Sequence, residues 1–116
     1  MRHNESKLQI SCVNWFRLQY PKLLLIAIPN GGKRNAFEAG ILKKEGVLAG
    51  CPDIFIPVAS KSFHGIFIEM KYGSGKLSNN QKNVIPELMK NGYCVQTCYS
   101  IDDFIKIINQ YFENEK

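Results

Sequence analysis

Two stretches of the sequence decide the expected fold: Asp53-Ile54-Phe55-Ile56-Pro57-Val58 and Ile66-Phe67-Ile68-Glu69-Met70-Lys71. Both are short, apolar and rich in Ile, Val and Phe, which is typical of buried β-strands. In an antiparallel hairpin that turns near residues 60–62, Asp53 lies opposite Glu69 or Lys71, and directly opposed side chains are about 5 Å apart at Cβ. Glu69 and Lys71 share one face because side chains alternate along a strand. The hairpin therefore predicts two carboxylates and an ammonium group converging at one end.

The predicted cluster of charges has two interpretations. Charged side chains on strands often face solvent, and Asp53, Glu69 and Lys71 can be explained in that way. The residues around them are nearly all Ile, Phe, Val and Met, however, so we expect both strands to be buried. A buried carboxylate without a partner costs free energy, and two that face each other cost more. A divalent cation removes both costs, so the pattern favours a cation site beside a positioned water.

Length and composition describe an ordinary globular protein. The 116 residues are enough for one hydrophobic core, so we expect a single domain over residues 1–116. No apolar run approaches the roughly 20 residues of a membrane span, and the N-terminal residues do not resemble a signal peptide. We therefore expect a cytoplasmic protein without a membrane partner. The formal net charge of +5 does not by itself decide whether nucleic acid is a partner.

The four cysteines, at positions 12, 51, 94 and 98, form no C-x-x-C motif. Cys94 and Cys98 belong to one expected strand and would lie about 13 Å apart, at about 3.3 Å per residue. That separation is too large for both to bind one ion, so a zinc finger is disfavoured. We expect four free thiols, packed mostly as small hydrophobic side chains.

The rest of the chain predicts alternating helices and strands. The expected order is α-β-α-β-β-α-β-α, which gives an α/β (α+β) fold with a mixed β-sheet flanked by helices. The apolar run 23–28 is uninterrupted, so we expect a central strand covered on both faces. Pro86 is expected to kink or break the second last helix. The expected helices are 5–19, 36–45, 79–90 and the segment after Ser100, and the remaining strand is 93–99.

Two helices carry further candidate site residues. Glu5 extends the helix face of Cys12 and Phe16, which would bring its carboxylate to the cation or its water; alternatively, it only complements the helix dipole. Gln81 has capping-box spacing from Ser78. Its side chain could instead turn inward toward the lysine, the water or a phosphate, and the spacing does not separate these roles.

Two loops carry candidate contacts with nucleic acid. The segment 30–35 leaves a strand through a Gly-Gly turn, and Asn30, Lys33 and Arg34 are placed there to contact a phosphate backbone, unless the loop is an ordinary flexible one. It lacks the spacing of a P-loop, so no nucleotide cofactor is expected. Lys76 follows the second Gly-rich loop, 72–75, near the predicted hairpin end.

The ordered set of motifs resembles the PD-(D/E)XK nuclease superfamily and, within it, the VRR-NUC (virus-type replication-repair nuclease) family. Each motif alone is common, but together they cover nearly the whole chain in the family's order. The motifs are Glu5-x-x-x-Gln9, Pro29-Asn30-Gly31-Gly32-x-Arg34, Gly46-Val47-x-x-Gly50-x-Pro52-Asp53, Glu69-x-Lys71, Leu77-Ser78-x-x-Gln81 and Gly92-Tyr93.

The resemblance implies a restriction-endonuclease-like core that hydrolyses phosphodiester bonds with Mg²⁺ or Mn²⁺. It makes Asp53, Glu69, the Met70 carbonyl and Glu5, directly or through water, the metal ligands. It places Lys71 and Gln81 beside Asp53 and Glu69 as catalytic residues. Phage-type stand-alone members resemble Holliday-junction resolvases, so the resemblance also implies a homodimer that acts on branched DNA in a bacterial host cell. The alternatives are a nucleic-acid-binding module that does not cleave, and a flap-specific or sequence-specific restriction-type nuclease.

Overall fold

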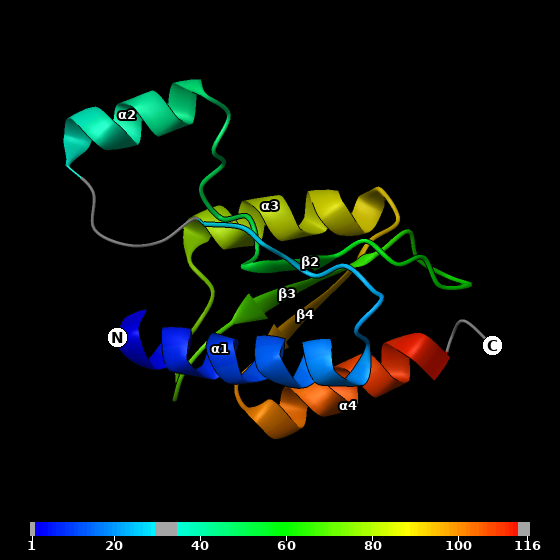
Figure 1. Cartoon of the computed structure of the whole chain (residues 1–116). Helices are drawn as coiled ribbons and strands as arrows, with labels where there is room; N and C mark the ends of the chain where they lie inside the picture. Colours follow the sequence, from blue (N-terminus) through cyan, green and yellow to red (C-terminus); the bar gives the residue numbers. More distant parts are fainter. Residues whose placement is uncertain (1, 30–34, 114–116) are drawn as a thin grey trace.

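The protein is a four-stranded mixed sheet with helices on both faces, seen in a computed structural model that describes residues 2–29 and 35–113 (Figure 1). The expected α/β fold and order of elements are confirmed. The strands are β1 (Ile26–Ala27), β2 (Ile54–Ile56), β3 (Ile66–Met70) and β4 (Cys94–Cys98), in the spatial order β1-β2-β3-β4. The helices are α1 (Arg2–Gln19), α2 (Ala36–Lys44), α3 (Asn79–Lys90) and α4 (Ile101–Glu113).

The predicted hairpin forms the centre of the sheet. Strands β2 and β3 are antiparallel with Ile54 opposite Ile68 and Ile56 opposite Ile66, and β4 runs parallel to β3. One step beyond the last pair, this register brings Asp53 opposite Glu69, as expected. The strands themselves are shorter than the predicted ranges 53–58 and 66–71. Strand β2 pairs with β3 only from Ile54 to Ile56, whereas β3 continues through Glu69 and Met70 alongside β4.

The hydrophobic core lies between the sheet and two helices that pack together, α1 and α4. The α1 side chains of Cys12 and Phe16 and the α4 side chains of Phe104 and Ile108 are fully buried there. Helix α3 covers the opposite side of the sheet, next to β4 (Figure 1). No disulfide bond joins any of the four cysteines, as predicted. None of the helices that the structure describes has the length and hydrophobicity of a membrane span.

The prediction of a central strand over residues 23–28 was wrong. Only Ile26 and Ala27 form a strand, and β1 lies at the edge of the sheet, paired with β2 alone. Leu24 is 66% exposed and Ile26 is 45% exposed. An apolar run predicts a strand, but it does not report which element covers that strand. Here the next helix, α2, projects away from the sheet and does not cover β1 (Figure 1).

The ends of α3 match the sequence signals, but its interior does not. The Ser78 side chain accepts from the Gln81 amide and the Gln81 side chain accepts from the Ser78 amide, so the predicted capping box is present. Pro86 does not break α3, which runs continuously from Asn79 to Lys90, and the alternative of a kink stays a prediction. Pro86 is exposed, so the proline ring displaces no packed neighbour, and the caps at both ends offset the lost hydrogen bond.

Candidate active site

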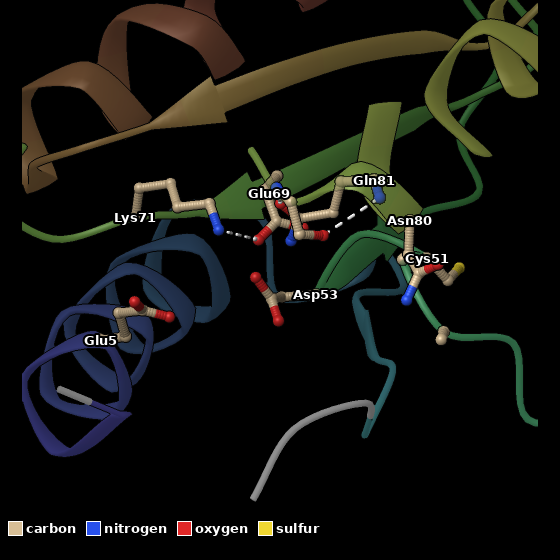
Figure 2. A pocket seen from close by; sticks show the side chains of 10 residues that line it. Glu5, Cys51, Asp53, Glu69, Lys71, Asn80 and Gln81 are labelled. Carbon is tan, nitrogen blue, oxygen red and sulfur yellow. Dashed lines mark hydrogen bonds and ion pairs between the residues drawn. The ribbon is translucent and has the colours of Figure 1, made fainter. Parts of the chain in front are cut away.

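A pocket of about 280 Å³ opens at the end of the β2–β3 hairpin. Three other parts of the chain complete its wall: Glu5 from α1, the loop 49–51, and the first turn of α3 (Figure 2). Because these segments are far apart in the sequence, the pocket exists only once the sheet has formed and both α1 and α3 have packed against it.

The Asp53 carboxylate is fixed by backbone contacts. Its Oδ2 accepts a hydrogen bond of 2.8 Å from the Met70 amide, on the opposite strand of the hairpin. Its carbonyl oxygen accepts one of 2.8 Å from the Ile28 amide, which follows β1. Asp53 is 9% exposed and the preceding residue, Pro52, is fully buried. The position of the carboxylate is therefore set by three adjacent segments of the sheet.

Glu69 lies beside Asp53 with one oxygen paired and one unpaired. Its Oε2 is 3.6 Å from the Lys71 ammonium nitrogen (Figure 2). Its Oε1 is buried and has no hydrogen-bond partner. Burial, and after it the charge of the neighbouring Asp53, raises the pKa of Glu69 from its ordinary 4.5 to about 8, and Lys71 opposes the rise. The same surroundings raise the pKa of the Cys51 thiol, through burial first and then through Glu69 and Asp53.

The donor atoms suit a hard, partly hydrated cation. Within residues 2–29 and 35–113, no three His, Cys, Asp or Glu side chains gather closely enough to form a closed metal centre. What the pocket offers is two adjacent carboxylates, an unpaired buried oxygen on Glu69, and an open side. Mg²⁺ binds through one or two carboxylates and keeps several waters, whereas structural zinc needs four protein ligands. The residues present therefore fit Mg²⁺ or Mn²⁺.

Two further predicted residues line the same pocket. The Glu5 carboxylate points from α1 toward Asp53 across the pocket, and the Glu5 side chain is half-buried (Figure 2). Gln81 both completes the capping box and lines the pocket, so the two roles weighed from the sequence are compatible. Its side-chain oxygen is used by the cap, which leaves the amide nitrogen for the pocket.

The remaining predictions fall elsewhere. Met70 contributes its amide to Asp53, while the role of its carbonyl oxygen stays a prediction. Lys76 is exposed and does not line the pocket. Asn30, Lys33 and Arg34 lie outside the residues that the structure describes.

The sequence did not assign Cys51 or Asn80 to the site, and Gly50 appeared only as part of a motif. Gly50 has a φ of +93°, and a Cβ on it would lie 2.4 Å from the Asn80 carbonyl carbon and 2.8 Å from the Gln81 amide nitrogen. The loop before Asp53 thus packs directly against the backbone of α3. In the sequence, the only signal was that residue 50 is a glycine, which can adopt a positive φ. A glycine does not reveal that the loop contacts α3.

Comparison with known proteins agrees with this geometry. A family model described as "VRR-NUC domain" matches residues 1–102. A solved structure titled "VRR_NUC domain protein" is similar to 97% of this chain and 90% of its own chain, with a TM-score of 0.80 and 30% sequence identity. A search of curated proteins finds no match.

Gly50→Ala should destabilise the protein more than Gly46→Ala. Both glycines have a positive φ, which costs an alanine about 1–2 kcal/mol, but a Cβ on Gly46 meets nothing within 4 Å. Only Gly50→Ala must also displace the first turn of α3. Thermal unfolding measures the difference in stability, and amide chemical shifts of Asn80 and Gln81 report the displacement. Equal losses and unchanged shifts would contradict the close packing.

In chelator, the protein should lose stability as the pH rises from about 4.5 to about 8, the ordinary and folded-state pKa values of Glu69. In this range the folded state holds a proton that the unfolded state has released, so the free energy of unfolding falls with pH. Glu69→Gln removes this titration, so its profile should be flatter and its stability at about pH 8 higher. Denaturant unfolding across the range measures both proteins, and parallel profiles would refute the assignment.

Proposed function

The chain belongs to the VRR-NUC domain family, and we propose that it is a metal-dependent nuclease that hydrolyses phosphodiester bonds in DNA. The observation that carries the proposal is the unpaired, buried Oε1 of Glu69 beside the Asp53 carboxylate. Retaining two adjacent buried carboxylates is unfavourable unless a cation compensates them. A purely DNA-binding domain with this fold would gain stability by losing one of them.

We assign Asp53 and Glu69 as ligands of Mg²⁺ or Mn²⁺, with the Met70 carbonyl oxygen as a further ligand and Glu5 acting directly or through water. Oxygen ligands of this kind are those that hard divalent cations prefer. A bound cation supplies positive charge that polarises the scissile phosphate and makes nearby water more acidic. Glu5 is well placed for the water-mediated role, because it reaches the pocket from a separate element, α1.

Lys71 is proposed to stabilise charge and orient the attacking water. Its ammonium group is held 3.6 Å from Glu69 Oε2, and its side chain is 12% exposed. An ammonium group fixed by a carboxylate in a partly dry pocket is prearranged to meet the charge that develops on phosphate oxygens. The ion pair supports this electrostatic role over that of a general base.

The path of the DNA outside the pocket is proposed from basic residues. We propose that Lys76, Asn30, Lys33 and Arg34 contact phosphates rather than bases, because each lies within or next to a glycine-rich stretch of the sequence. The exposed position of Lys76, after the end of β3, is compatible with such a contact.

We further propose a homodimer that acts on branched DNA such as four-way junctions. Two symmetric cuts need two active sites, which a two-fold dimer supplies. Among the apolar residues of the chain that an interface could use, Tyr111 and Phe112 belong to or pack against the core. Phe37 and Ile41 remain: they are 77% and 41% exposed on α2, which projects from the body (Figure 1).

Asp53→Asn should lose most of the Mn²⁺ affinity and cleavage activity and still fold, because an amide oxygen can accept the Met70 hydrogen bond that the carboxylate accepts now. Calorimetric titration with Mn²⁺ and cleavage of labelled junctions, flaps and duplexes measure the two losses. Wild-type cleavage that persists in excess chelator would overturn metal dependence. Absence of cleavage of every substrate by the metal-loaded wild type would favour the DNA-binding alternative.

Lys71→Met should bind DNA and metal nearly as well as wild type but cleave at least about 10²-fold more slowly, the lower end for a positioned catalytic group. The thioether keeps the length of the side chain and removes the charge beside Glu69. Single-turnover rates at saturating Mn²⁺ make the comparison. A rate close to that of wild type would reduce Lys71 to a structural ion pair.

Phe37→Glu should convert the dimer to a monomer at micromolar concentration. Met89→Glu is the matched control, because Met89 is 57% exposed on α3 and lies on another element. Light scattering gives the mass, and a junction assay shows whether paired incisions are lost with the dimer. A wild-type monomer that prefers single flaps to four-way junctions would contradict the proposal.

A further inference from the structure

The pocket has an acidic side and a donor side. Glu5, Asp53 and Glu69 contribute carboxylates from α1 and the hairpin, whereas the first turn of α3 contributes neutral polar side chains. Two of the latter, Ser78 and Gln81, bond to each other's backbone in the capping box. The third, Asn80, takes no part in the cap. The donor side therefore contains a side chain that helix capping does not account for.

The backbone of Asn80 is held in place by Gly50. A Cβ at position 50 would lie 2.4 Å from the Asn80 carbonyl carbon and 2.5 Å from its oxygen, so the two backbones are in direct contact. Gly50 is three residues before Asp53 in the chain, so this contact fixes Asn80 relative to the proposed cation ligands. Figure 2 shows the Asn80 side chain next to Cys51, on the side of Asp53 opposite to Glu5 and Lys71.

The chemistry of this position suits a phosphate oxygen. A carboxamide is neutral and has two N–H donors, and the positive end of a helix dipole favours a neighbouring anion. On the acidic side the carboxylates repel a phosphate, and Lys71 together with a bound cation would have to offset that repulsion. We propose that the Asn80 side chain donates to a non-bridging oxygen of the DNA phosphate at the cation site, and so positions that phosphate for attack. This inference rests on the proposed nuclease function.

The neighbouring residue gives a matched control. Asn79 is the same residue type, is also exposed, and belongs to the same first turn of α3. It does not line the pocket, because successive residues are rotated by about 100° around a helix. Any effect of a substitution on helix propensity or dipole is shared by the two positions, whereas only Asn80 lines the pocket.

The test compares Asn80→Asp with Asn79→Asp. Each adds one negative charge to the first turn of α3, which favours the helix, so both variants should unfold at or above the wild-type temperature. In single-turnover cleavage at saturating Mn²⁺, Asn80→Asp should be slower by at least about 10-fold, the effect of losing one hydrogen bond to a charged group. Asn79→Asp should stay within about twofold of wild type. Asn80→Ala should also be slower than wild type, with unchanged Mn²⁺ affinity.

A second measurement separates this inference from the function on which it rests. Affinity for a short labelled duplex in Ca²⁺ should fall more for Asn80→Asp than for Asn79→Asp, whether or not the protein cleaves. If wild type cleaves, but Asn80→Asp and Asn79→Asp have the same cleavage rate and the same affinity for the duplex, the proposed role of Asn80 is wrong and the nuclease function stands. If wild type does not cleave, the function fails and the binding comparison alone decides on Asn80. Altered Mn²⁺ affinity in Asn80→Ala would instead place Asn80 among the groups that act on the cation, which overturns the inference.

Discussion

The structure depends on one hydrogen bond, from the Met70 amide to the Asp53 carboxylate, 2.8 Å long and buried. It joins the two strands of the hairpin at the point where their pairing ends, and it holds one carboxylate in place while the register brings Glu69 alongside. Charge-assisted bonds of this kind are stronger than neutral ones. Burial first, and then the resulting proximity to Asp53, raises the pKa of Glu69.

The two faces of the hairpin explain why the carboxylates cannot turn elsewhere. Ile66, Ile68 and Met70 point into the core beneath α1 and α4, so the alternation of side chains directs Phe67 and Glu69 to the other face. There Phe67 stacks on Phe55 at 4.3 Å between ring centroids. A slip of one residue would move Glu69 into the core and the isoleucines out of it. Core packing thus enforces the acidic pair, at a cost in stability that a cation would offset.

Much of this was predictable from the sequence, for physical reasons. Side chains alternate between the two faces of each hairpin strand, which gave the positions of Asp53, Glu69 and Lys71. Helix ends carry local caps, such as the one between Ser78 and Gln81, and these short-range patterns gave the order of elements. The edge position of β1 was not predictable, because hydrophobicity at Leu24 says nothing about which element covers it. Asn80 was missed because its place in the pocket results from contact with Gly50, thirty residues earlier in the chain.

The exposure of helix α2 is relevant to the proposed homodimer. It has 9 residues and none of them is buried, yet isolated helices shorter than roughly 12–15 residues are marginal in water. The Asn35 cap, which accepts from the Glu38 amide, adds only a modest stabilisation. Phe37 and Ile41 meanwhile present apolar area that a monomer would leave in water. A second copy that covers these side chains would supply the packing that α2 lacks, and so would stabilise the helix and form the proposed dimer through the same contact.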